Sequence, residues 1–223
     1  MKNYVVIVAG GSGSRMQTAQ PKQFIELEGR PILMHTLDAF YNSGLTMHLI
    51  LVLPEDHLKT WQGLVKQHNY KTTHQITTGG STRFDSVKNG LSVINEDGIV
   101  AIHDGARPLI SSEVIQRTVV QARKTGNGIA AVQMKDSIRQ KVGGQNKAVD
   151  RNQFYSIQTP QTFKVDLIKN AFKNSESNAF TDDASVLEAH GEPIHLVEGS
   201  YDNLKITTPE DLMIATSILK RRK

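Results

Sequence analysis

A glycine-rich loop directly after a short apolar segment is the sequence feature that most constrains the fold. Residues 4–8 read Tyr-Val-Val-Ile-Val, and residues 9–13 read Ala-Gly-Gly-Ser-Gly. The β-branched run predicts a buried strand. Glycines have no Cβ, so their backbone N–H groups can approach an anion closely. The pair of segments therefore predicts a strand that ends in an anion-binding loop, with an ordinary glycine-rich turn as the alternative.

Two cations follow these glycines. Arg15 and Lys22 would place positive charge where phosphates would lie, which suits a nucleoside triphosphate. Two commoner motifs do not match. A dinucleotide fingerprint needs Gly or Ala at Met16, and a P-loop needs a Gly-Lys-Ser/Thr tripeptide that the sequence lacks. Gly-Gly-x-Gly-x-Arg-Met with a downstream Pro-Lys is instead typical of nucleotidyltransferases.

Composition limits the partners and the chemistry. The 223 residues include no cysteine, which excludes disulfides, thiolate metal sites and cysteine nucleophiles. The apolar run at residues 5–9 is too short for a signal peptide or a membrane span, so we expect a cytoplasmic protein without a membrane partner. The net charge is +4, but part of it lies in residues 220–223, which we expect to be a frayed, solvated tail. No basic stripe with interleaved aromatic residues is present, so we expect anionic small molecules rather than nucleic acid.

Strand-like and helix-like segments alternate along the chain. The expected strands are residues 5–8, 49–53, 99–103, 129–132 and 194–197. The expected helices are residues 31–41, 57–68, 82–94, 111–124, 164–172, 181–190 with Thr181 as N-cap, and a last helix from 208. Such alternation predicts an α/β fold of the Rossmann-like, doubly wound kind, with a mainly parallel sheet and helices on both faces.

The alternation breaks between residues 136 and 150. Strand-like residues 137–141 and 147–149 flank Gly143-Gly144-Gln145-Asn146, which predicts a hairpin with a flexible turn. An isolated two-stranded arm is marginally stable in water, so we expect it to pack on something else, such as a second subunit. A simple surface hairpin is the alternative. We therefore expect one nucleotidyltransferase domain over residues 1–223, with an arm at about 136–155 that could serve in dimerisation.

A second chemical cluster follows the expected strand 99–103. Residues 103–108 read His-Asp-Gly-Ala-Arg-Pro. Ligands of open parallel sheets bind at the carboxyl ends of the strands. Asp104 could hold Mg²⁺ or another divalent cation, and Arg107 could bind a phosphate. The alternative is that Asp104 caps a turn and pairs with Arg107. We expect His103 to be a packed core histidine.

Three further signals are weaker. Gly80 and Ser81 precede an expected helix, whose free amides could contact a base, ribose or phosphate, although capping alone explains the serine. Residues 150–161 are unusually polar for an element between strand and helix, and Arg151 and Thr159 there could bind a second anion. Lys205 is typical of a solvated lysine.

Taken in order, these motifs resemble the family of 2-C-methyl-D-erythritol 4-phosphate cytidylyltransferases. The resemblance covers nearly the whole chain and rests on residues 9–16, 21–23, 103–108, 150–152, 159–161, 181–185 and 202–205. It implies that CTP and methylerythritol phosphate give CDP-methylerythritol and pyrophosphate, in non-mevalonate isoprenoid synthesis. It also implies a homodimer whose arm reaches the partner's active site.

The resemblance also implies a role for each matching residue. The residues implied in catalysis are Arg15, Lys22, Arg151 and Lys205, of which Arg151 would come from the partner subunit. Those implied in binding CTP and its metal are Ala9, Gly10, Gly11, Gly13, Arg15, Lys22, Gly80, Ser81, Ser86 and Asp104. Those implied in binding the polyol phosphate are Arg107, Ser137, Arg151, Thr159, Thr181 and Lys205. Ser137 departs from the threonine usual there, which keeps the hydroxyl and loses a methyl group.

Two other functions remain open. One is a cytidylyltransferase for a pentitol phosphate such as ribitol 5-phosphate, which would share the glycine loop and the arm. The other is a non-catalytic nucleotide-binding module on the same fold. A full set of cations beside a candidate metal carboxylate favours an enzyme, and no residue pattern in the sequence reads a cytosine edge.

Overall fold

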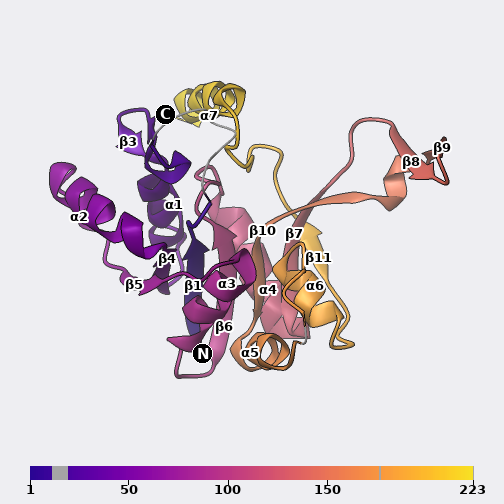
Figure 1. Ribbon diagram of the computed structural model, residues 1–223, viewed down its shortest axis with the longest axis horizontal. Coiled ribbons are helices and arrows are strands. Elements are labelled where there is room, and N and C mark those ends of the chain that lie inside the picture. The colour runs from indigo at the N-terminus through magenta and orange to yellow at the C-terminus, as the bar shows by residue number, and fades with distance from the viewer. Residues whose placement is uncertain (12–19, 176, 223) are drawn as a thin grey trace.

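A seven-stranded sheet forms the centre of the protein (Figure 1). The computed structural model describes residues 1–11, 20–175 and 177–222. The strand order is β11-β7-β10-β6-β1-β4-β5. The strands are β1 (Lys2–Val8), β4 (Met47–Leu53), β5 (Gln75–Thr78), β6 (Gly98–Asp104), β7 (Asn127–Gln133), β10 (Tyr155–Lys164) and β11 (Leu196–Glu198). A short pair, β2 (Glu26–Leu27) and β3 (Arg30–Pro31), forms a separate small sheet.

The central sheet is mainly parallel. Strand β1 runs parallel to β4 and β6, β4 to β5, and β7 to β11. Strand β10 alone among these runs antiparallel to its two neighbours, β6 and β7. Parallel strands need crossover connections, and helices provide them here. The predicted doubly wound α/β fold is therefore confirmed.

Helices cover both faces of this sheet because successive side chains of a strand point to opposite faces. Val6 of β1 packs in a cluster with α3 (Arg83–Ser92), α5 (Val165–Asn174) and α6 (Asp183–Glu188). Val5 and Ile7 pack in the opposite cluster with α1 (Ile32–Tyr41), α2 (Leu58–Gln67) and α4 (Ser112–Thr125). These two apolar layers hold the strands, so that residues at the strand ends have fixed positions.

The sequence did not reveal strand β10, which lies inside the sheet, nor edge strand β5 and the short pair β2 and β3. The polar segment of β10, expected as an element between strand and helix, instead enters the middle of the sheet between β7 and β6. Gln161 and Thr162 are buried there. Their polar groups have partners: Thr162 Oγ1 donates to Thr118 Oγ1 at 2.9 Å, and Gln161 Oε1 accepts from the N–H of Ala184 at 2.8 Å. Polar side chains with partners of this kind can occupy a central strand.

The hairpin arm extends away from the sheet at the right of Figure 1. Its strands are β8 (Ile138–Val142) and β9 (Gln145–Val149). The turn is shorter than expected, because Val142 pairs with Gln145 and only Gly143 and Gly144 lie between the strands. Both glycines have positive φ, 56° and 82°, which suits the two-residue turns of hairpins.

Helix ends differ from expectation at two places. Asp182, not Thr181, is the N-cap of α6, because its carboxylate accepts from the N–H of Ser185 at 3.0 Å. The expected tail at 220–222 is instead the end of α7 (Pro209–Arg222). Arg221 and Arg222 pair with Asp202 at 2.7 and 3.3 Å, which holds this end against the protein.

Over the described ranges, none of the helices combines the length and apolarity that crossing a membrane requires.

Helix α3 lies so close to the sheet that Gly90 has no room for a side chain. A Cβ at Gly90 would lie 2.4 Å from Val6 Cγ1 and 2.9 Å from Val52 Cγ2. These neighbours belong to strands β1 and β4, which also carry the glycine loop and its surroundings. The distance of α3 from the sheet thus depends on a close contact that only glycine permits.

We predict that Gly90→Ala destabilises the protein by about 1–3 kcal/mol, because the added methyl group overpacks the core. Gly63→Ala is the matched control, since nothing lies within 4 Å of a Cβ at that position of α2. Alanine favours a helix over glycine by about 1 kcal/mol, so the control should be neutral or more stable. Urea unfolding of both variants measures the difference. Equal stability of the two variants would contradict the close packing.

Candidate functional site

The carboxyl ends of β1 and β6 meet beside the glycine loop. The N–H of Gly105 donates to Val8 O at 2.9 Å, and the N–H of Ala9 donates to Val52 O at 3.0 Å. A cavity of about 210 Å³ lies at this edge. The described residues predicted to bind the nucleotide all line it: Ala9, Gly10, Gly11, Lys22, Gly80, Ser81, Ser86 and Asp104. The fold thus collects residues from four separate segments around one space.

The start of helix α3 forms one wall of this first cavity. Thr82 caps the helix with a reciprocal pair of bonds to Asp85, whose backbone N–H lies 3.1 Å from Thr82 Oγ1. Ser86 Oγ accepts from the N–H of Gly80 at 3.1 Å. A Cβ at Gly80 would lie 2.3 Å from Asp85 Cβ, so this position accepts only glycine. These bonds fix the turn whose residues Gly80, Ser81 and Ser86 border the cavity.

Lys22 is held in the wall by the residues that follow it. It begins a short 3₁₀ turn, Lys22–Phe24. Gln23 is 2% exposed, and its side-chain amide donates to Ala9 O at 2.9 Å. Phe24 is fully buried and stacks on Trp61 with ring centroids 6.2 Å apart. The backbone of Lys22 is therefore held in place by its buried neighbours, directly beside the glycine loop.

A second cavity, of about 310 Å³, adjoins the first. Arg107, Thr159, Thr181 and Lys205, all predicted to bind the second substrate, line it. Arg83, Asp104 and Lys205 line both cavities. The two spaces therefore meet at one group of charged side chains.

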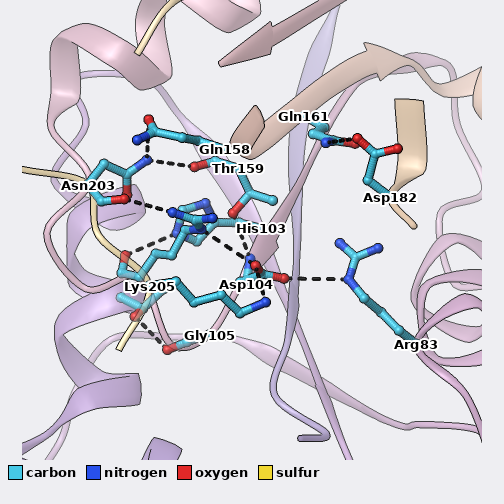
Figure 2. Close-up of polar contacts among 12 residues, drawn as sticks. Arg83, His103, Asp104, Gly105, Gln158, Thr159, Gln161, Asp182, Asn203 and Lys205 are labelled. Carbon is cyan, nitrogen blue, oxygen red and sulfur yellow. Dashed lines mark hydrogen bonds and ion pairs between the residues drawn. The ribbon is translucent and has the colours of Figure 1, made fainter. Parts of the chain in front are cut away.

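Asp104 is the centre of that group (Figure 2). Lys205 Nζ lies 2.9 Å from its Oδ2, Arg107 Nε lies 3.5 Å from Oδ2, and Arg83 Nε lies 3.5 Å from Oδ1. Burial alone would raise the pKa of Asp104, but the three cations outweigh it and hold the pKa well below its usual range. The carboxylate is ionised at neutral pH, and it holds Arg83 and Lys205 where the two cavities meet and Arg107 on the wall of the second.

Two segments fix the position of Asp104. Strand β6 ends at this residue, and its backbone N–H donates to Thr159 Oγ1 at 3.0 Å. The register of β10 against β7 shifts between Ile157 and Gln161, which brackets Thr159. The irregularity in β10 thus coincides with the hydrogen bond that Thr159 Oγ1 accepts from the backbone of Asp104.

Lys205 belongs to this cluster and is not simply solvated, as its sequence context indicated. The loop before it is fastened at Asn203, which is fully buried and donates from Nδ2 to Thr159 O at 2.8 Å. After it, the N–H of Ile206 donates to Ala106 O at 2.8 Å. The side chain of Lys205 is 40% exposed, so the ammonium can reach both Asp104 and a ligand.

Four predicted residues are not placed at these cavities. Gly13 and Arg15 lie outside the described residues. Ser137 and Arg151 are exposed on or beside the arm and line neither cavity. Arg151 follows strand β9 in a short 3₁₀ turn, Arg151–Gln153, and donates from Nη1 to Lys135 O. Within one chain, the structure separates these two residues from the site.

Arg83 is the site residue that sequence reasoning missed. It is the first residue of α3 and lines both cavities. The sequence signal that could have pointed to Arg83 is its position in the motif Gly-Ser-x-Arg-x-Asp-Ser, at an expected helix N-terminus. Its two carboxylate partners are distant in sequence, so local pattern could not assign it.

Comparison with known proteins decides the family. Residues 3–221 match the family described as IspD: 2-C-methyl-D-erythritol 4-phosphate cytidylyltransferase. The chain belongs to this cytidylyltransferase family.

Individual relatives agree with the family match. The chain is 45% identical over 214 residues to the protein of that name from Bacteroides fragilis, covering 96% of this chain and 98% of the relative. It is 43% identical over 219 residues to the one from Bacteroides thetaiotaomicron, covering 98% and 100%. Among solved structures, 4-diphosphocytidyl-2C-methyl-D-erythritol synthase from Anaerococcus prevotii has a TM-score of 0.85 at 31% identity, covering 99% of this chain and 96% of that one. The resemblance noted in the sequence is confirmed.

His103 lies beneath the cluster as a core residue, as expected. It is fully buried, and its Nε2 lies 3.1 Å from Arg107 O, so the neutral ring donates a hydrogen bond there. Its ring also meets Phe40 edge-on, with centroids 4.8 Å apart. Burial lowers the pKa of His103 to about 4. The ring is neutral at pH 7 and fixes the backbone that carries Arg107.

We predict that His103 makes stability fall with acidity. Its pKa is about 4 in the folded protein and about 6.5 in the unfolded chain, so the unfolded chain binds the proton first. The free energy of unfolding should fall between pH 6.5 and 4, by up to about 3 kcal/mol from this residue. In urea unfolding, the His103→Gln variant should not show this part of the decrease in the free energy of unfolding. The control His48→Gln, at an exposed position, should keep it, and equal pH dependence of both variants would contradict the assignment.

Proposed function

We propose that the protein transfers the cytidylyl group of CTP to 2-C-methyl-D-erythritol 4-phosphate, giving CDP-methylerythritol and pyrophosphate. The observation that carries the proposal is the meeting of two cavities at Asp104 and its three cations. Membership of the cytidylyltransferase family supports it. Two phosphorylated reactants need such a place, where both can approach one cation cluster.

The first cavity is the proposed CTP site. Lys22, the glycine loop and the start of α3 offer a cation and backbone amides there, which are suited to a triphosphate. Arg15 and Gly13 complete this proposed site from sequence alone. The expected role of Lys22 and Arg15 is to stabilise the charge that develops on the phosphates in the transition state.

The second cavity is the proposed site of the polyol phosphate. Lys205 and Arg107 would hold its phosphate, and the hydroxyls of Thr159 and Thr181 would contribute hydrogen bonds. A phosphate monoester has a second pKa of about 6, so it is largely a dianion at pH 7 and a ready nucleophile. One of its oxygens attacks the α-phosphorus of CTP, the new P–O bond forms, and pyrophosphate leaves. No general base is required.

A divalent cation such as Mg²⁺ fits the first cavity in one particular way. Among the residues that the structure describes, no group of three or more His, Cys, Asp or Glu side chains could hold a metal ion. Magnesium, however, is commonly held by one or two carboxylates together with substrate phosphates and water. Asp104 is an ionised carboxylate on the wall of this cavity and fits that mode. When bound, the ion would neutralise charge on the phosphates.

The main barrier in this reaction is the repulsion between two anions brought into line. Cations that already point at the reacting groups lower this barrier without reorganising at the moment of reaction. Here Asp104 keeps Arg107 and Lys205 assembled at the second cavity. The protein therefore contributes position and charge rather than a proton acceptor.

Release of pyrophosphate tests the proposed function. With CTP and Mg²⁺, the protein should turn over methylerythritol phosphate and prefer it to ribitol 5-phosphate. Preference for ribitol 5-phosphate would support the pentitol phosphate alternative. Absence of release with either polyol at saturation would contradict the enzyme and favour a nucleotide-binding module.

A matched pair of lysine variants links this turnover to the first cavity. Lys22→Ala should lower kcat by about 10²–10³, the usual effect of removing one group that stabilises transition-state charge. Lys59→Ala, at an exposed position of α2 that lines neither cavity, should retain wild-type turnover. Similar kcat values for both variants would contradict the role of Lys22.

The arm is proposed to complete the site of a second subunit. Ser137 and Arg151 lie on or beside it and line neither cavity of their own chain. The base of the arm also exposes apolar side chains, with Phe154 41% and Tyr155 46% exposed. A homodimer would cover such side chains and bring Arg151 of one subunit to the polyol phosphate of the other.

Complementation between two inactive variants tests this arrangement. Arg151→Ala and Lys205→Ala should each lose most activity, because each removes a cation from every site. In a mixed dimer, one site would have both cations intact. Co-expression should therefore restore about a quarter of wild-type activity if half of the dimers are mixed. Recovery no greater than the sum of the separate variants would mean that Arg151 acts within its own chain or not at all.

A further inference from the structure

Arg83 connects two segments that are 100 residues apart in sequence. Its Nη1 and Nη2 donate to Asp183 Oδ1 and Oδ2 at 2.8 and 2.7 Å, a two-point ion pair. Asp183 is 1% exposed. The Nε of Arg83 faces Asp104 at 3.5 Å from the other side (Figure 2). The guanidinium therefore bridges two carboxylates.

Asp183 begins helix α6 and lies two residues after Thr181. Gln161 of the sheet also holds this start of α6, because its Nε2 donates to Asp182 Oδ2 at 2.8 Å and its Oε1 accepts from the N–H of Ala184 at 2.8 Å. Thr181 and Asp182 line the second cavity, and neither lines the first. The position of this segment thus affects the shape of the second cavity alone.

Arg83 itself has a fixed origin. It is the first residue of α3, directly after the capping residue Thr82, and the capping bonds hold that turn. The same turn carries Ser81 and borders the first cavity. The backbone of Arg83 therefore belongs to the wall of the first cavity, while its ion pair with Asp183 contacts the segment that lines the second.

We propose that Arg83 is a positioning residue for the reaction, which holds the Thr181 segment against the start of helix α3 so that the second cavity fits the polyol phosphate. This inference rests on the proposed function. Asp183 takes one N–H of each terminal nitrogen and Asp104 faces Nε, so three of the five guanidinium donors are directed at carboxylates of the protein. Lys205 and Arg107 remain the cations on the second cavity that face the acceptor.

Arg83→Lys tests the inference, because lysine keeps the charge and cannot form the two-point pair. The KM for methylerythritol phosphate should rise about tenfold or more, and clearly more than the KM for CTP, because the displaced Thr181 segment lines only the second cavity although Arg83 itself also lines the first. Asp183→Asn should give the same pattern. The double variant should add little to either single change, because both act through one interaction.

Arg30→Lys is the matched control. Arg30 also pairs with a carboxylate, Asp38, at 2.6 Å, but it lines neither cavity. Both KM values should be unchanged in this variant. Thermal unfolding identifies a variant that is simply misfolded; if Arg83→Lys is one, Asp183→Asn provides the same KM comparison.

The outcomes separate the inference from the proposed function. A wild-type protein that releases no pyrophosphate would contradict the proposed function. If the wild type is active but Arg83→Lys and Asp183→Asn raise both KM values equally, the inference is wrong and the proposed function stands. Unchanged KM values in these two variants would overturn it as well. A selective rise in the KM for the polyol phosphate in both variants would support it.

Discussion

The site depends on one buried carboxylate in contact with three cations. Asp104 ends β6, Arg107 follows it, Arg83 begins α3 and Lys205 lies before α7, so the cluster joins three separate parts of the chain. A buried charge without partners is costly, and removing one partner of a buried pair typically destabilises a protein by about 3–5 kcal/mol. The same charges that suit phosphate chemistry therefore also tie the surrounding segments together.

The sequence predicted most of the framework because its signals are local. β-branched runs indicated the parallel strands, and caps and glycines indicated the helix ends. Strand β10 was missed because Gln161 and Thr162 look unsuited to a core. Their partners, Ala184 and Thr118, are distant in sequence and provide the missing hydrogen bonds. No local pattern contains that information.

The candidate site divides in the same way. Residues in glycine-rich or strand-end motifs, such as Gly80 and Asp104, could be assigned from sequence and resemblance, and the fold places them around one cavity. Lys205 appeared solvated, and Arg83 had no assigned role, because each depends on a carboxylate far away in the chain. Asp183 lies 100 residues from Arg83. Long-range ion pairs are thus the part of the site that only the folded structure supplies.

Charge balance gives an independent reason to look beyond one chain. Around the second cavity, Arg83, Arg107 and Lys205 oppose Asp104, Asp182 and Asp183, which leaves no net formal charge. The polyol phosphate alone carries about two negative charges at pH 7, and a triphosphate adds more. The positive charge of Lys22 offsets part of the negative charge of the two substrates, but not all of it. The proposed sources of further positive charge are a divalent cation, Arg15 and the Arg151 that lies at the base of a partner's arm. The electrostatic need of the reaction thus argues for the same partner subunit as the exposed apolar residues at the base of the arm.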